Sequence, residues 1–199
     1  QRQMCIRDSH TFLLNPSTTE SVNPLMFASM PFDPQRDLRP VGLLANSQLF
    51  LFVRSSLGVD TLEAFVEYAR KQPNPLNYGS AGNGTTPHLA GELLKQATGM
   101  QATHAPYRGV APAIQDLAAG QIDFAFGPAT VFPMVQAGKL KVLAVASRQR
   151  AAVAPDIRTF SEAGIDGVFA DSLFGVYAAS GTRDDVVERM NAEINKVLA

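Results

Sequence analysis

The residues best suited to chemistry lie in one glycine-rich segment, residues 79–88, with the sequence GSAGNGTTPH. Its glycines allow the backbone to turn tightly and to approach a ligand without interference from a Cβ atom. Ser80, Thr85 and Thr86 add hydroxyl donors, and Thr86 followed by Pro87 predicts the N-cap and first residue of a helix. Free N–H groups at a helix N-terminus attract anions. The segment therefore predicts an oxyanion site made of neutral dipoles, and a βα turn with helix-capping hydroxyls is the alternative.

The same segment comes close to three enzyme motifs without matching any of them. Gly79 and Gly84 have the spacing of a nucleotide-binding P-loop, but Thr85 stands where that motif needs lysine. The interval between the glycines also fails the dinucleotide-binding pattern. Ser80 resembles the serine of a nucleophile elbow, yet Tyr78 replaces the first glycine of that motif. Nucleotide binding is therefore disfavoured, and a serine hydrolase would need a histidine base oriented by a carboxylate.

The three histidines of the chain, His10, His88 and His104, show no metal-ligand spacing, so no metal and no cofactor are predicted. His88 falls within the first turn of the expected helix, where capping or packing is the simpler role. The one cysteine, Cys5, lies in residues 1–9, which resemble a translated adapter and are interpreted as a non-native scar. Without those residues, disulfides and thiolate metal sites are excluded.

A second hydroxyl-rich segment, residues 15–20, has the sequence NPSTTE and directly follows an apolar stretch at residues 10–14. It carries Ser17, Thr18 and Thr19, which offer the same donors as the glycine-rich segment. Taken alone, this segment is better explained as a solvated turn. Because ligands of α/β sheets bind at the carboxyl ends of strands, two such loops together favour a shared anion pocket.

Composition excludes several classes of protein. The 199 residues include 17 Lys and Arg against 18 Asp and Glu, a formal net charge of -1, so no basic stripe is available for nucleic acid. No apolar run approaches the ~20 residues that cross a bilayer. Hydrophobic residues make up 46% of the chain, which is enough to bury a core. We therefore expect a folded chain that neither spans a membrane nor binds nucleic acid.

Strand and helix patterns alternate along the chain. Asp60 and Glu63 predict a capping box, and apolar residues at helical spacing accompany it: Leu62, Phe65, Val66 and Ala69. Thr182 predicts the N-cap of a last helix. Further helices are expected at residues 87–98, 111–119, 129–136 and 183–198, and strands at residues 10–14, 41–45, 48–53, 76–78, 102–105, 122–126 and 140–146. This alternation predicts an α/β fold with a parallel or mixed sheet covered by helices on both faces.

Longer motifs run through the chain. Residues 80–92 read SAGNGTTPHLAGE, residues 106–113 read PYRGVAPA, and residues 117–123 read LAAGQID. Further matching runs lie at residues 23–38, 137–145 and 174–182. In these motifs, from about residue 10 to its end, the chain resembles the periplasmic substrate-binding proteins of the tripartite tricarboxylate transporter family, the Bug proteins.

The resemblance implies a periplasmic-binding-protein-like, Venus-flytrap fold of two α/β domains. Family members begin with an export signal, a first strand and a glycine-rich ligand loop, and they continue beyond the last helix. The chain is therefore expected to be an internal fragment, incomplete at both ends and without its signal peptide. Residues 10–53 would form part of domain 1, residues 54–170 would form domain 2, and residues 171–199 would return to domain 1.

Family ligands are small carboxylates, held mainly by backbone amides, hydroxyls and bridging waters. Carried over by the motifs, the ligand-binding residues would be Ser17, Thr18 and Thr19 in domain 1 and Ser80, Asn83, Gly84, Thr85, Thr86 and His88 in domain 2. Gly127, Pro128 and Ala129 would form a further wall, at positions where members often carry Asp or Asn. Because only Glu20 could pair with an ammonium group, a plain mono- or dicarboxylate is favoured over an amino acid.

The resemblance also implies a role. The protein would be a periplasmic receptor, monomeric when full-length, that closes two domains on a carboxylate and delivers it to the integral-membrane permease subunits of the transporter. It would have no catalytic activity, no cofactor and no nucleic-acid partner. Two alternatives remain: a hydrolase or transferase that uses Ser80, and the ligand-sensing domain of a cytoplasmic regulator, which would need a helix-turn-helix.

Overall fold

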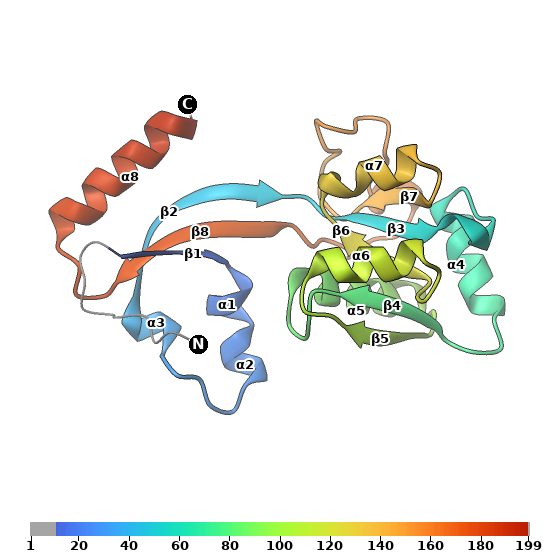
Figure 1. The fold of residues 1–199 in the computed structure, drawn as a ribbon, viewed down its shortest axis with the longest axis horizontal. Coiled ribbons are helices and arrows are strands. Elements are labelled where there is room, and N and C mark those ends of the chain that lie inside the picture. Colours follow the sequence, from blue (N-terminus) through green and yellow to red (C-terminus); the bar gives the residue numbers. More distant parts are fainter. Residues whose placement is uncertain (1–10, 199) are drawn as a thin grey trace. The chain divides into compact units, whose positions relative to one another are not determined.

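The computed structural model describes residues 11–198, and the chain divides into two compact units. Of the described residues, 11–47 and 172–198 form unit 1, and Gln48–Asp171 form unit 2. Figure 1 labels the helices and strands of both units. The interpretation of residues 1–9 as a scar lies outside the described residues, as does Cys5.

Unit 1 is built on a three-stranded antiparallel sheet in the order β1-β8-β2. Its strands are β1 (Phe12–Pro16), β2 (Leu38–Ser47) and β8 (Ser172–Ala179). Its helices are α1 (Thr18–Ser21), α2 (Asn23–Met26), α3 (Pro34–Asp37) and α8 (Asp184–Leu198). The amphipathic helix α8 buries Val187 against Val41 and Val176 of the sheet, so a small core of its own holds this unit together.

Unit 1 departs from the sequence-based expectation in several places. Residues 15–20, expected to be a loop, belong in part to β1 and α1. The strand expected at residues 41–45 is longer, spanning ten residues. No strand was expected at the position of β8. Its buried residues do not alternate, so the two-residue period of a strand is hidden in the sequence. α8 begins at Asp184, so the expected cap, Thr182, lies two residues before the helix.

Unit 2 is built on a five-stranded sheet in the order β5-β4-β6-β3-β7. Its strands are β3 (Phe50–Arg54), β4 (Leu76–Ser80), β5 (Ala102–Pro106), β6 (Phe124–Gly127) and β7 (Leu140–Val145). β4 runs parallel to β5 and β6, whereas β3 runs antiparallel to β6 and β7. The sheet is therefore mixed, which is one of the two forms that the alternating pattern allowed.

The position of β3 moves the expected domain boundary. Placing residues 48–53 in the first domain is wrong, because β3 is hydrogen-bonded on both sides within the unit 2 sheet. Unit 2 accordingly begins at Gln48 instead of at residue 54. An apolar strand buried on both faces gives no local sign of which sheet it joins.

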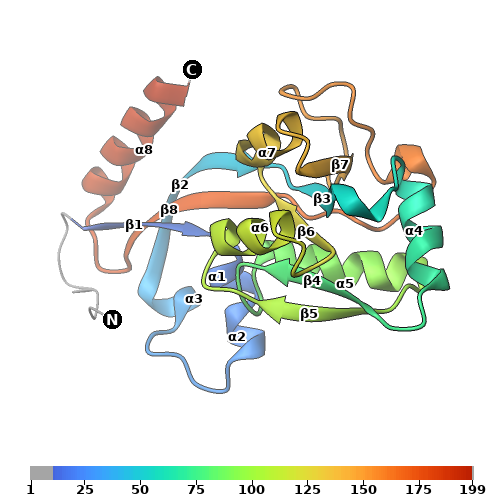
Figure 2. The same ribbon diagram turned by 45° about the vertical axis from the view of Figure 1, so that its right-hand side comes forward.

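Helices cover both faces of the unit 2 sheet (Figure 2). They are α4 (Leu62–Lys71), α5 (Thr86–Thr98), α6 (Val110–Ala118) and α7 (Phe132–Gln136), with 3-10 turns at Ser55–Leu57, Ala129–Val131 and Ser161–Ala163. The Thr61 hydroxyl accepts a 3.1 Å hydrogen bond from the Ala64 amide. Thr61 is therefore the N-cap of α4, and the expected cap at Asp60 is wrong by one residue.

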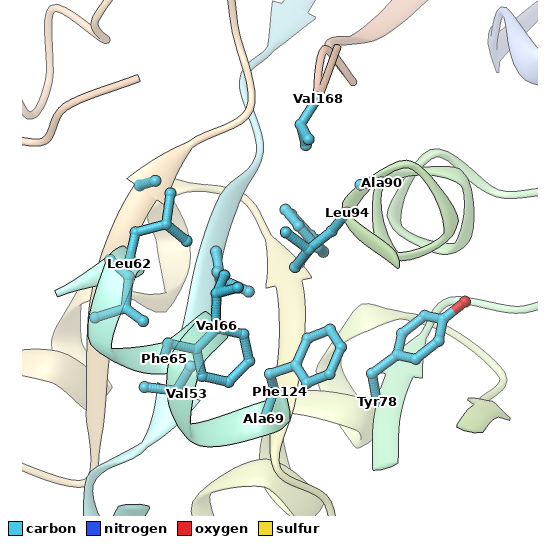
Figure 3. Packing of buried hydrophobic residues seen from close by; sticks show 14 of the residues in the cluster. Val53, Leu62, Phe65, Val66, Ala69, Tyr78, Ala90, Leu94, Phe124 and Val168 are labelled. Carbon is cyan, nitrogen blue, oxygen red and sulfur yellow. The ribbon is translucent and has the colours of Figure 1, made fainter. Parts of the chain in front are cut away.

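Two buried clusters fill the two faces of this sheet. α4 and α5 contribute to one cluster, and α6 and α7 pack on the other. In the first cluster the Phe124 ring lies between those of Phe65 and Tyr78 (Figure 3), with ring centroids 5.3 and 5.2 Å apart. All three side chains are fully buried. This aromatic packing anchors β4 and β6, the two strands that lead into the loops described below.

Asp123 ties three strands of unit 2 together just before β6. Its carboxylate accepts hydrogen bonds from Arg54 Nε at 3.0 Å and from the Asn77 amide at 2.8 Å. Its own amide donates to the Asn77 carbonyl at 2.8 Å. Because Arg54 ends β3 and Asn77 lies in β4, Asp123 holds both neighbours of β6 in register.

Replacing Asp123 by Ala should lower the free energy of unfolding by about 1.5–3 kcal/mol, because a charged acceptor shared by two strands is lost. The control is Asp60→Ala. Asp60 pairs with Lys141 at 2.6 Å, but its side chain is 79% exposed, so its loss should cost less than about 1 kcal/mol. Urea unfolding followed by circular dichroism measures both variants. Equal losses would contradict a special role for Asp123.

Candidate functional site

Three loops of unit 2 lie at one edge of its sheet, because β4, β5 and β6 run parallel and end at the same side. The loops are residues 81–85 after β4, residues 107–109 after β5 and residue 128 after β6. From β4 the chain passes through α5 to β5 on one side, and then through α6 to β6 on the other. Such a change of direction opens a crevice where α/β proteins bind ligands. α5 and α6 both begin at this edge, so their dipoles favour an anion there.

The loop after β4 depends on its glycines. Gly82 has a φ of 125° and Gly84 a φ of 76°, conformations that residues with a side chain rarely adopt. A Cβ atom on Gly79 would lie 2.5 Å from the Ile122 side chain, so the end of β4 is packed closely against the segment before β6. The glycines therefore set the path of this loop and bring its backbone to the edge of the sheet.

Ser80 is the last residue of β4 and is only 1% exposed. Its hydroxyl accepts a hydrogen bond from the Gly82 amide and donates to the Gly82 carbonyl, both at 3.1 Å. The same oxygen lies 2.6 Å from Nε2 of His104. The expectation that Ser80 contacts a ligand directly does not fit this burial, and its hydroxyl instead braces the loop from within.

The start of α5 differs by one residue from the expectation. α5 begins at Thr86, so Thr85 occupies the N-cap position, and the expected cap at Thr86 is wrong. The Thr85 hydroxyl donates to the Gly82 carbonyl at 2.7 Å, which closes the turn instead of capping the helix amides. Thr86 is the first helical residue and is 6% exposed. The left-handed Gly84 redirects the chain, and the helix therefore starts immediately after Thr85.

His88, in the first turn of α5, is held between the loop and β5. Its Nδ1 accepts a 3.1 Å hydrogen bond from the Gly84 amide. Its ring stacks on the His104 ring with centroids 4.1 Å apart, and the His104 ring lies 4.9 Å from that of Tyr78. Burial lowers the pKa of His88, and burial together with the neighbouring His88 lowers the pKa of His104 to about 4. Both imidazoles are therefore uncharged near pH 7.

The remaining unit 2 candidates lie at the same edge. Asn83 is exposed in the loop. Gly127 ends β6 and is buried, and Pro128 and Ala129 follow it half-buried. The parallel pairing of β4 with β6 thus gathers all the candidates predicted in this unit: Ser80, Asn83, Gly84, Thr85, Thr86, His88, Gly127, Pro128 and Ala129.

In unit 1 the candidates Ser17, Thr18 and Thr19 directly follow β1 and are half-buried. Ser17 is the N-cap residue of α1 and lines a pocket of about 320 Å³ with residues of β2 and β8. The Glu20 carboxylate accepts a 3.0 Å hydrogen bond from the Asn15 side chain. These residues are therefore part of a folded helix start and not of a solvated turn.

Two residues of the edge escaped the sequence analysis. His104 lies in β5, opposite Tyr78 in the parallel pairing with β4, and reaches Ser80 from there. Tyr107 follows β5: its amide donates to the Ser80 carbonyl at 3.0 Å and its hydroxyl to Asp116 at 2.8 Å. The motif PYRG at residues 106–109 could have indicated Tyr107, but nothing in the sequence around His104 indicates that it contacts Ser80.

In the part of the chain that the structure describes, no three His, Cys, Asp or Glu side chains gather as a metal ion would require. None of the described helices combines the length and the apolar character needed to cross a membrane. The polar groups at the edge of unit 2 are backbone amides, hydroxyls, the Asn83 side chain and uncharged imidazoles, together with the exposed guanidinium of Arg108 in the loop after β5. Such groups stabilise an anion through dipoles and hydrogen bonds.

The sequence model of the tripartite tricarboxylate transporter family receptors matches residues 2–199. The chain belongs to this family. A relative of this receptor chain in Pseudomonas sp. (strain P51), a UPF0065 protein in the tcbD-tcbE intergenic region, is 37% identical over 194 residues, 96% of the chain and 57% of the relative. Protein BugT of Bordetella pertussis is 30% identical over 194 residues, 96% of the chain and 59% of BugT. The receptor chain thus spans less than two thirds of either relative.

Solved structures share the fold of the receptor chain. Rpa4515 of Rhodopseudomonas palustris, solved with adipate, is 33% identical with a TM-score of 0.91 over 96% of the chain and 64% of that protein. MatC of the same organism, solved with malate, is 29% identical with a TM-score of 0.85 over 96% of the chain and 65% of MatC. The periplasmic binding protein BugD is 27% identical with a TM-score of 0.83, covering 96% of the chain and 64% of BugD.

These comparisons confirm the family and the periplasmic-binding-protein-like α/β fold that the sequence motifs indicated. Members of the family are periplasmic solute-binding receptors and not enzymes. The receptor chain spans about 64% of the solved relatives, so the activity of the whole protein is taken up below as a proposal.

Gly91, within α5, approaches β4 so closely that a Cβ atom would lie 2.2 Å from the Tyr78 ring. Replacing glycine by alanine inside a helix normally stabilises a protein by ~0.5–1 kcal/mol. Gly91→Ala should instead lower the free energy of unfolding by about 1–3 kcal/mol, because the Tyr78 ring must move away from Glu92 and His104. Urea unfolding gives the sign of the change.

Gly181→Ala is the control for this prediction, because a Cβ atom at Gly181 would meet nothing within 4 Å. Its free energy of unfolding should stay within about 0.5 kcal/mol of the unsubstituted protein. A stabilised Gly91→Ala variant would show that α5 does not pack on Tyr78 as described.

Proposed function

We propose that the complete protein is a periplasmic solute-binding receptor for small carboxylates, which delivers its ligand to the integral-membrane permease subunits of a tripartite tricarboxylate transporter. One observation carries the proposal: in a member of this receptor family, a glycine-rich loop and the starts of α5 and α6 share the carboxyl edge of three parallel strands. The proposal includes no catalysis and no cofactor. We expect the complete receptor to act as a monomer.

Only those parts of the loop after β4 that are exposed to solvent can contact the ligand. Asn83 is exposed and Thr85 is half-buried, whereas Ser80 and Thr86 are buried. We assign the carboxylate contact to the Asn83 side chain and the start of α5. The hydroxyls of Ser80 and Thr85 and the Gly84 amide donate within the site and support the loop from inside. A carboxylate at the start of α5 gains ~0.3–2 kcal/mol from the helix dipole alone.

Two further groups complete the proposed set. Gly127 ends β6 and Pro128 and Ala129 follow it, and together they form a neighbouring wall at the same edge of unit 2. In unit 1, Ser17, Thr18 and Thr19 follow β1 and offer hydroxyl donors to the ligand. The hydroxyls of the unit 1 group are neutral donors, which can hydrogen-bond a carboxylate.

The ligand class follows from these donors and from the relatives. The glycine-rich loop lacks the lysine that a triphosphate would need. Rpa4515 and MatC were solved with adipate and malate, which are both dicarboxylates. We therefore propose a dicarboxylate of about four to six carbons, recognised by neutral donors and helix dipoles at each carboxylate.

The complete protein should bind adipate or malate in a calorimetric titration, and the dimethyl ester of the bound acid should bind at least about tenfold more weakly. The ester has no charge at the helix terminus and therefore forfeits the dipole contribution. Thr85→Val should weaken binding about fivefold, because the loop loses the hydrogen bond that closes its turn on the Gly82 carbonyl, whereas Thr85→Ser, the matched control, should keep most of the affinity. Equal affinity for the acid and its ester would overturn the proposed recognition.

The contact between Ser80 Oγ and His104 Nε2 resembles half of a catalytic triad. Two observations speak against a nucleophile. Ser80 is 1% exposed, and the nearby carboxylate of Glu92 accepts hydrogen bonds from Tyr78 at 2.6 Å and from Lys95 at 2.9 Å. The pair therefore supports the structure of the loop.

Esters and amides of the bound dicarboxylate should emerge unchanged after prolonged incubation with the complete protein, because Ser80 is buried and forms no complete triad. Chromatography of the mixture measures turnover, and Ser80→Ala serves as the matched variant. Turnover that disappears in Ser80→Ala would replace the receptor proposal with an esterase.

A further inference from the structure

Two stacked imidazoles, one from α5 and one from β5, lie against the glycine-rich loop. The His88 ring comes from α5 and the His104 ring from β5, with centroids 4.1 Å apart and an interplanar angle of 28°. Each ring also contacts the loop: His88 Nδ1 accepts from the Gly84 amide at 3.1 Å, and His104 Nε2 lies 2.6 Å from Ser80 Oγ. Two histidines thus support the loop at two points.

These contacts prescribe the protonation state of His88. Nδ1 can accept the Gly84 N–H only while it carries a lone pair, so the single proton of the neutral ring resides on Nε2. Protonation of Nδ1 would place two donors face to face and break this bond. His104 differs, because a proton on Nε2 can still point at the Ser80 hydroxyl. The acid-sensitive atom is therefore Nδ1 of His88.

We propose that the stacked pair His88 and His104 positions the glycine-rich loop for ligand binding, and that protonation of His88 releases Gly84 and lowers ligand affinity in acid. This inference rests on the proposed receptor function. Both histidines act as positioning residues, so His88 supports the loop instead of contacting the ligand directly as the sequence suggested.

The groups around the pair have opposing effects. From α5, the Glu92 carboxylate favours the charged imidazole, and Lys95, which binds Glu92 at 2.9 Å, opposes it. From β4, the neutral hydroxyl of Tyr78 is hydrogen-bonded to Glu92 at 2.6 Å, and burial with that contact raises its pKa. From β5, the His104 ring stacks on His88 at 4.1 Å, and burial with the neighbouring His88 lowers the pKa of His104. Glu92 is thus shared among Tyr78, Lys95 and the imidazoles and cannot fully compensate a charge on His88.

The sign of the pH effect follows from the folded pKa. Burial lowers the pKa of His88 below the ~6.5 of a free imidazole, and burial with the neighbouring His88 lowers that of His104 to about 4. A state with a depressed histidine pKa holds fewer protons than its open or unfolded counterpart. The intact loop therefore loses stability as the pH falls from about 6.5 through the folded pKa values.

The ligand-independent test uses nuclear magnetic resonance of the complete, unliganded protein. The Gly84 amide signal and the His88 ring signals should titrate together between about pH 7.5 and about pH 5, with the Gly84 amide losing protection from hydrogen exchange. In His88→Asn, whose Oδ1 replaces Nδ1 as an acceptor that takes no proton in this range, the Gly84 signal should no longer titrate. A Gly84 amide that ignores the titration of His88 would overturn the proposal.

The second arm measures adipate affinity by calorimetry at both pH values. The unsubstituted protein should lose up to about tenfold in affinity for each pH unit below the folded pKa of His88, because one proton must leave on binding. His88→Asn should bind more weakly than the unsubstituted protein at about pH 7.5 but show a flatter pH profile, and His88→Leu should bind weakly throughout. Protonation of adipate itself contributes equally to every variant and cancels from the comparison.

His10→Asn is the matched control, since it removes the third histidine of the chain and should reproduce the unsubstituted profile. Identical acid profiles for His88→Asn and the unsubstituted protein would overturn the proposal. Absence of adipate binding at about pH 7.5 would instead count against the proposed ligand class. In that case the Gly84 titration alone would decide whether the histidines position the loop.

Discussion

An unbroken series of ring contacts connects the core of unit 2 to its candidate site, and the site depends on it. Phe65 packs on Phe124, Phe124 on Tyr78, Tyr78 on His104, and His104 on His88. The first three rings are fully buried, and the last two hold the glycine-rich loop through hydrogen bonds. Aromatic contacts of this kind contribute ~0.5–1.5 kcal/mol each beyond their buried area. The loop therefore rests on the core and not on solvent-exposed contacts.

This arrangement explains why glycine occurs where it does around Tyr78. The ring fills the space between β4 and α5, and only glycine at position 91 leaves room for it. The Tyr78 hydroxyl then reaches Glu92, which also binds Lys95. Packing thus places the polar network of Tyr78, Glu92 and Lys95 at the boundary between the hydrophobic cluster and the loop. There it lies beside the two uncharged imidazoles, which are partly shielded from water.

The chemistry of the edge is mainly that of preorganised neutral groups, with Arg108 exposed in the loop after β5. Glycines at positive φ set the path of the loop, and their amides donate inward to Ser80 and His88, while helix termini add partial positive charge. Such a site suits the reversible binding of a small carboxylate, which needs hydrogen-bond donors but no exposed nucleophile. The members of the family solved with adipate and malate are consistent with this chemistry.

Local patterns in the sequence determined the glycine-rich loop, the amphipathic face of α4 with Leu62 and Phe65, and the motifs of the family. These features are readable because turn glycines and helical periodicity act over a few residues. The α/β class with a parallel or mixed sheet followed from the alternation of elements.

Only the tertiary structure decided which strands meet. The pairing of β4 with β5 brings His104 to Ser80, 24 residues away, and turns a predicted ligand contact into an internal brace. The left-handed Gly84 moves the start of α5 to Thr86, and non-alternating burial conceals β8. β3 is apolar on both faces, so its place in unit 2 is set by hydrogen bonds to β6 and β7. Such contacts join residues that are far apart in the sequence, so the local spacing of residue types cannot predict them.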